Sequence, residues 1–175
     1  FIPDYKYFSL TNLDANHIKL IEKRTYDIAA LSPSTVTVSL NNEKLAVKTF
    51  TDYVNLYIGS EEKTPRVVEV CGTRWKIVMC TSMNDKFENI SFVNGIYTSL
   101  GGKHVEYISD QINNYLYEYM KKKYKKLSIR ESFIRDRYML FIQSTIENPT
   151  FSSQTKEELT SHSDKFGSKC VLSKS

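Results

Sequence analysis

The amino-acid sequence predicts an α+β fold, in which helices pack on one face of a β-sheet. Residues 66–70, 74–81 and 87–93 have the composition and alternation of half-buried strands, and residues 138–146 form an apolar run typical of a buried strand. Residues 105–123 have the period of an amphipathic helix. A sheet built from these strands, with the long helix covering one face, gives the predicted class.

The composition is that of a globular protein. The chain has 175 residues, of which 41% are hydrophobic and 25% charged, enough for one domain or for one domain and part of another. It contains no run of about eighteen apolar residues, so we expect no membrane span. The first residues, FIPD, are not a signal peptide, and without an initial methionine we expect a segment cut from a longer chain.

Cysteine content and charge give weaker indications. Cys71, Cys80 and Cys170 match no zinc-binding spacing, so we expect small buried side chains in a reducing compartment. The net charge of +4 permits contact with nucleic acid without requiring it. His17, His104 and His162 show no triad or metal-binding pattern, and no catalytic residue is expected in this segment.

The N-terminal part predicts a helix followed by a hairpin. Asp14 can cap a helix over residues 15–30, and Pro33 prevents its continuation. Alternating apolar residues on both sides of Asn41-Asn42 predict a β-hairpin, because asparagine tolerates the positive φ of a tight turn. A short helix is expected over residues 50–58.

The long helix is preceded by a glycine loop at residues 94–104. Its glycines fit no phosphate-binding pattern, so we expect them to let the chain turn tightly into the helix. The apolar stripe of the helix is expected to face the core, and it consists of Val105, Ile108, Ile112, Tyr115 and Tyr119.

A lysine cluster closes this helix. It consists of Lys121, Lys122, Lys123, Lys125 and Lys126. Lysines at a helix C-terminus complement the helix dipole, and such an end is most often simply solvated. The alternative is sequence-independent binding of phosphates, with release of counterions. From the residues alone, both interpretations stay open.

The last strand leads into a polar loop. A short helix over residues 128–136 precedes this strand, and Pro149 ends it because proline has no N–H to donate. Gln154 and Lys156 follow, and a lysine on a loop can place a point charge on a terminal phosphate. Most loop lysines are only solvated. A further helix is expected to begin over residues 156–160.

Three motifs in this order resemble the type IIA DNA topoisomerases. They are ENPTFSSQTKE at 147–157, similar to the family's QTK loop, ISFVNGIYTSLGGKH at 90–104, and FGSKC at 166–170. The resemblance is to the eukaryotic branch, which includes enzymes of large DNA viruses, and the lysine-, asparagine- and tyrosine-rich composition favours a viral member. Ser152 stands where eukaryotic members usually have aspartate.

The resemblance implies an architecture. Residues 1–49 would be the C-terminal end of a GHKL ATP-binding domain, and residues 50–175 a transducer domain with a mixed sheet and a left-handed βαβ crossover, like the second domain of a small-subunit ribosomal protein.

The resemblance also implies roles for residues. Gln154 and Lys156 would contact ATP, and the lysines at 121–123, 125 and 126 would sense DNA. Magnesium ligands, the general base and the DNA-cleaving tyrosine would lie outside this segment. The implied activity is ATP-driven passage of DNA strands by an intracellular homodimer, in the nucleus or, for a virus, the host cytoplasm. The alternative is a basic nucleic-acid-binding module on the same fold, without a nucleotide role.

Overall fold

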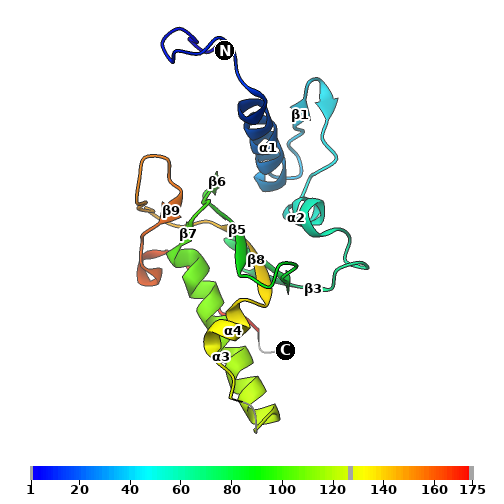
Figure 1. The fold of residues 1–175 in the computed structure, drawn as a ribbon, viewed down its shortest axis with the longest axis vertical. Coiled ribbons are helices and arrows are strands. Elements are labelled where there is room, and N and C mark those ends of the chain that lie inside the picture. Colours follow the sequence, from blue (N-terminus) through cyan, green and yellow to red (C-terminus); the bar gives the residue numbers. More distant parts are fainter. Residues whose placement is uncertain (1, 126–127, 174–175) are drawn as a thin grey trace. The chain divides into compact units, whose positions relative to one another are not determined.

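The computed structural model describes residues 2–125 and 128–173, and the chain divides into two compact units, Phe1–Tyr53 and Val54–Ser175 (Figure 1). The boundary falls inside α2 (Phe50–Ile58). Within the described ranges, no helix has the length and apolar character that a membrane crossing needs.

The first unit contains the predicted helix and hairpin. α1 (Ala15–Leu31) begins where Asp14 accepts hydrogen bonds from two backbone N–H groups, as expected of an N-cap. β1 (Ser39–Leu40) pairs with β2 (Glu43–Lys44) across Asn41 and Asn42, whose φ angles are 51° and 68°. The helix and the turn are confirmed, although the paired strands are shorter than the sequence pattern.

A buried carboxylate ties this unit together. Asp27 on α1 is 1% exposed, and it accepts hydrogen bonds from the Tyr53 hydroxyl at 2.6 Å and the Lys23 ammonium at 3.1 Å. These partners compensate the desolvation that an isolated buried carboxylate would suffer.

The second unit is built on a mixed five-stranded sheet with the order β3-β4-β8-β5-β6. The strands are β3 (Arg66–Cys71), β4 (Trp75–Thr81), β5 (Glu88–Val93), β6 (Ile96–Tyr97) and β8 (Tyr138–Ser144). Within this sheet, β5 and β8 pair in parallel, and the other neighbours are antiparallel. The predicted mixed α+β architecture is confirmed.

Two helices connect the parallel strands. α3 (Lys103–Lys123) and α4 (Glu131–Arg135) lie between β5 and β8 in the chain, which makes a βαβ unit. The left hand of this crossover stays a prediction. The central strand β8 has side chains buried on both faces, which explains its continuous apolar run.

The main core lies between α3 and one face of the sheet. Ile108 of α3 is fully buried there, and the cluster also contains Trp75, Ile77, Val93, Val105, Ile112, Leu140 and Ile142. On the opposite face, Phe141 meets Tyr57 of α2 in an edge-to-face contact. The predicted core stripe is wrong at Tyr115 and Tyr119, which are 44% and 49% exposed, because the sheet ends before the last turns of α3 (Figure 1).

The C-terminal segment packs against this core. Phe166 and Cys170 are fully buried, and the Trp75 indole N–H donates to the Ser168 hydroxyl at 2.8 Å. The Gln111 side chain of α3 bonds the backbone of Cys170 and of Leu172. The segment is therefore part of the second unit, although its sequence has no periodicity.

Cys71 and Cys170 form a disulfide between β3 and the C-terminal segment. The expectation of reduced cysteines is wrong for this pair, because the fold brings together two residues that are 99 positions apart. In the chain-entropy model, a closed loop of this length contributes about 4.7 kcal/mol to stability. Cys80 is a buried free cysteine as expected, and burial raises the pKa of its thiol.

Candidate functional site

The loop with Gln154 and Lys156 projects from a paired base. Phe151 and Leu159 form an antiparallel bridge across its two ends, and the Ser152 N–H donates to the Glu158 carbonyl at 3.1 Å. The Thr160 N–H donates to the Thr150 carbonyl at 2.9 Å. The two ends of the loop are thus held together, and residues 152–157, hereafter the QTK loop, form its tip.

The base of this loop rests on the glycine segment. β7 (Gly101–Gly102) pairs in parallel with β9 (Glu158–Leu159), and the Leu100 N–H donates to the Glu157 carbonyl at 2.9 Å. The helix predicted for residues 156–160 is therefore wrong, since the carbonyls of Glu157 and Glu158 accept hydrogen bonds from Leu100 and Ser152 and β9 pairs with β7.

Gly102 makes this pairing possible. Its φ is 119°, and a Cβ at this position would overlap the Leu159 backbone. Gly101 also has a positive φ, 74°. The expected structural role of the glycines is confirmed, and it includes the close approach of two backbones.

Lys156 is held in an unusual backbone conformation. Its φ is 60°, and its N–H donates to the Ser153 carbonyl at 3.1 Å. A positive φ in a residue with a side chain costs about 1–2 kcal/mol and is concentrated at functional positions. The ammonium lies 5.7 Å from the centroid of the Phe151 ring, while Gln154 is exposed. This loop can present a cation and an amide to an anionic group.

A buried chain of hydrogen bonds through His104, Thr98 and Ser91 lies next to the glycine segment. His104, at the start of α3, is fully buried, and its Nε2 lies 3.2 Å from the Thr98 hydroxyl. Thr98 donates to the Ser91 carbonyl, and its hydroxyl lies 2.7 Å from that of Ser91. Desolvation lowers the pKa of His104 to about 3, so the imidazole is neutral. The sequence shows only that His104 follows a glycine pair by two residues, so its burial and its hydrogen bond were not predictable.

The lysine cluster lies at the other end of α3. Lys121, Lys122, Lys123 and Lys125 are exposed, and the predicted Lys126 falls outside the described residues. A helix of 21 residues is about 30 Å long, so the structure does not bring the lysines and the QTK loop together. α3 connects the base of the QTK loop to the lysine cluster, because its first residues adjoin β7, which pairs with β9 at that base, and its last residues are lysines.

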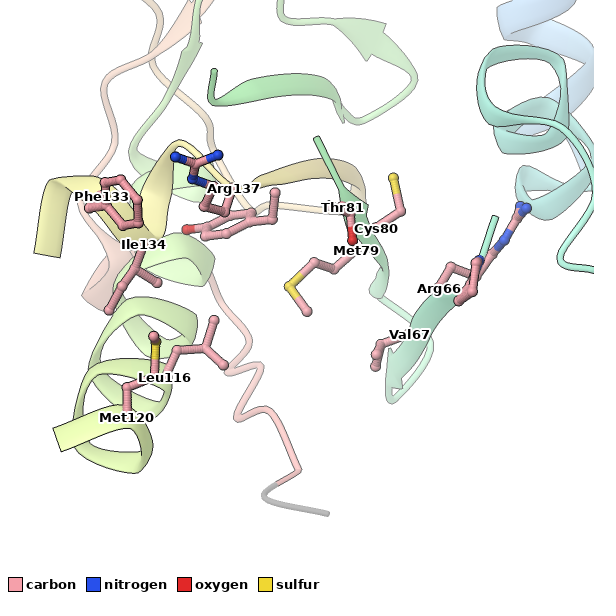
Figure 2. A pocket seen from close by; sticks show the side chains of 12 residues that line it. Arg66, Val67, Met79, Cys80, Thr81, Leu116, Met120, Phe133, Ile134 and Arg137 are labelled. Atoms are coloured by element: carbon pink, nitrogen blue, oxygen red, sulfur yellow. The ribbon is translucent and has the colours of Figure 1, made fainter. Parts of the chain in front are cut away.

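An apolar cavity of about 440 Å³ has no residue of the QTK loop in its lining and reaches Met120, next to the lysine cluster (Figure 2). It opens between β3, β4, α3 and α4, and its lining includes Met79, Leu116, Met120, Phe133 and Ile134. None of the predicted site residues lines it. In the part of the chain that the structure describes, no three His, Cys, Asp or Glu side chains are grouped to hold a metal ion.

Comparison with known proteins decides the family. The model for DNA gyrase B matches residues 45–175. The chain belongs to the DNA gyrase B family. It is 39% identical to DNA topoisomerase 2 of Arabidopsis thaliana and 41% identical to human DNA topoisomerase 2-alpha, with 99% of this chain and 12% of each relative covered.

Solved structures agree. The ATPase region of Saccharomyces cerevisiae topoisomerase II matches with a TM-score of 0.87 and 37% identity, over 98% of this chain and 43% of the yeast chain. The ATPase and transducer domains of topoisomerase II from Balamuthia mandrillaris match with a TM-score of 0.84 over 91% of this chain. The chain is homologous to the ATPase and transducer region of type IIA topoisomerases, and it spans about one eighth of the length of the curated relatives.

The first prediction concerns Gly102. Gly102→Ala forces a Cβ into the Leu159 backbone, so we expect a decrease of at least about 2 kcal/mol in the free energy of unfolding, and loosening of the QTK loop. Gly72→Ala is the matched control, because Gly72 also has a positive φ, 59°, but open space around it. Urea denaturation of both variants measures the difference. Equal decreases would show that the close approach is unimportant.

The second prediction concerns His104 and pH. The unfolded histidine titrates near its usual pKa of 6.5, whereas the folded one stays neutral until about pH 3. Only the unfolded state gains a proton in this window, so stability is fully present above pH 6.5 and falls below it, by up to about 1.4 kcal/mol per pH unit.

Denaturation between pH 7 and pH 5, above most carboxylate pKa values, measures this slope. We expect a shallower slope for His104→Asn than for the wild type. Parallel slopes would mean that His104 is not a neutral buried group.

Proposed function

We propose that this chain couples the nucleotide state of a type IIA DNA topoisomerase to the movement of a gate for duplex DNA. The observation that carries the proposal is the QTK loop: its base is paired at both ends, and its lysine is held at a φ of 60°. On this proposal residues 1–49 are the end of the GHKL domain and residues 50–175 are the transducer domain, and the two compact units divide four residues later, after Tyr53.

Lys156 and Gln154 act on ATP in this account. The ammonium of Lys156 binds the terminal phosphate as a point charge, and the Gln154 amide orients it. ATP supplies the anion, which is present before hydrolysis and absent after phosphate release. Lys156 therefore has a charged partner in only one state, and only such a differential interaction can shift a conformational equilibrium.

The size of this interaction fits a switch. A charge-assisted hydrogen bond contributes about 1.5–3 kcal/mol, which changes the ratio of two conformations about ten- to a hundredfold. The ammonium now lies over the Phe151 ring, a weaker cation–π contact worth about 0.5–1 kcal/mol at an exposed position. Phosphate is the stronger partner, so the lysine moves to it when the nucleotide is bound.

The remaining parts of the proposal follow from the family. The enzyme works as a homodimer, with magnesium held by residues outside this segment, and the exposed lysines at 121–123 and 125 detect duplex DNA. It acts inside the cell, in the nucleus or, if the source is a virus, in the host cytoplasm.

The third prediction tests Lys156. Lys156→Ala is expected to reduce ATP hydrolysis at least tenfold in an enzyme that contains this chain and the complete nucleotide site, because alanine cannot bind the phosphate. Lys156→Gly also removes the cost of the positive φ, so it is expected to be more stable than the alanine variant and equally inactive. Lys165→Ala, at another exposed lysine, is the control.

Steady-state hydrolysis at saturating ATP, with and without duplex DNA, gives the answer. Normal turnover of both Lys156 variants would contradict the nucleotide role. The basic end of α3 would then favour the second candidate function, a nucleic-acid-binding module without a nucleotide role.

A further inference from the structure

Two exposed tyrosines of α3, and a third that directly follows the helix, accompany the lysines. Tyr115, Tyr119 and Tyr124 are 44%, 49% and 43% exposed, and we call them the tyrosine face. Tyr115 and Tyr119 are four residues apart, so they lie on one side of the helix, and Lys122 and Lys123 continue that side. In Figure 1 these last turns of α3 extend past the strands of the sheet, while Leu116 and Met120, on another side of the helix, face α4 across the apolar cavity.

The positive charge of this surface favours an anionic partner. Residues 115–125 contain Lys121, Lys122, Lys123 and Lys125 against the single acid Glu118, a net charge of +3. Tyr115, Glu118, Tyr119, Lys121 and Lys122 line one open hollow of about 450 Å³. Exposed tyrosine beside clustered lysine suits a polyanion whose surface also accepts hydrogen bonds, and DNA has both properties.

The contacts of the rings favour phosphates over bases. The Lys123 ammonium lies 5.3 Å from the ring centroid of Tyr119 and 5.6 Å from that of Tyr124, so it occupies ring faces on which bases would otherwise stack. It also donates to the Tyr119 hydroxyl at 3.1 Å, and this contact raises the pKa of Lys123. A phenol that accepts from an ammonium keeps its own O–H hydrogen for a second partner.

We propose that the tyrosine face is part of the DNA-sensing surface and that its hydroxyls donate hydrogen bonds to phosphates of duplex DNA. From Tyr115 to Lys123 the helix rises about 12 Å over eight steps of about 1.5 Å, which is the length of about three to four base pairs. This inference rests on the proposed function, and it extends the DNA contact from the lysine cluster along two turns of α3.

The test is binding of a fluorescent short DNA duplex to this chain, measured by anisotropy at several salt concentrations. Replacing Tyr115 and Tyr119 by phenylalanine keeps the rings and removes the hydroxyls. We expect about three- to tenfold weaker binding for each hydroxyl, with an unchanged dependence on salt, because the charge stays the same. Tyr7→Phe, at a 79% exposed tyrosine of the other unit, is expected to have no effect.

Charge variants are expected to behave differently. Changing Lys121, Lys122 and Lys123 to glutamine should weaken binding and reduce the slope of log K against log salt by about 0.9 for each phosphate that the protein no longer neutralises. Glu118→Gln should strengthen binding, because it removes the like charge in the hollow.

These outcomes distinguish the role of the tyrosines from the DNA contact made by the lysines. Unchanged binding by the phenylalanine variant, with weakened binding by the lysine variant, would overturn the role of the tyrosines and leave the proposed DNA contact in place. Unchanged binding by the lysine variant would overturn the DNA contact itself. If the phenylalanine variant keeps its affinity while a serine variant binds more weakly and prefers single strands, the tyrosines stack on bases, and the phosphate inference is wrong.

Discussion

The parallel pairing of β7 with β9 is the interaction on which the proposed site depends. It joins the glycine segment before α3 to the strand that follows the QTK loop, and it exists only because Gly102 has no side chain to strike Leu159. Together with the Phe151–Leu159 bridge, it closes the loop on both sides. The position of Lys156 is thus set by hydrogen bonds between backbones, which side-chain substitutions in the loop itself do not remove.

Through the same pairing, α3 links the loop base, the main core and the lysine cluster of the second unit. The helix begins at the β7–β9 pair, packs Ile108 into the main core and ends in exposed lysines and tyrosines. A packed helix transmits displacement at one end to the other with little deformation, because protein interiors are dense. An event at the QTK loop and an event at the lysine cluster can therefore bias one movement of the same rigid element, which is the physical content of coupling in our proposal.

Local patterns predicted the elements, whereas contacts between distant segments were not predictable. Asp14, the asparagine turn and the alternation from Trp75 gave correct elements because capping, turns and pleats are local. The helix predicted at 156–160 was wrong because β9 pairs with β7, a contact that the local sequence does not show. The predicted burial of Tyr115 and Tyr119 was wrong because helical periodicity does not show where the sheet beneath the helix ends. The roles that we propose for Gln154 and Lys156 came from the motif spelling; their residue types alone favoured solvated loop positions.

Hydrogen exchange of the amides at the loop base tests the central claim most directly. The N–H groups of Leu100, Ser152 and Thr160 donate to Glu157, Glu158 and Thr150 across the base. If the QTK loop is pre-organised, these amides exchange slowly without nucleotide in an enzyme that contains this chain and the complete nucleotide site, and a non-hydrolysable ATP analogue adds little protection. Rapid exchange without nucleotide, followed by strong protection when the analogue binds, would contradict the account, because nucleotide would then create the base that we describe as built into the fold.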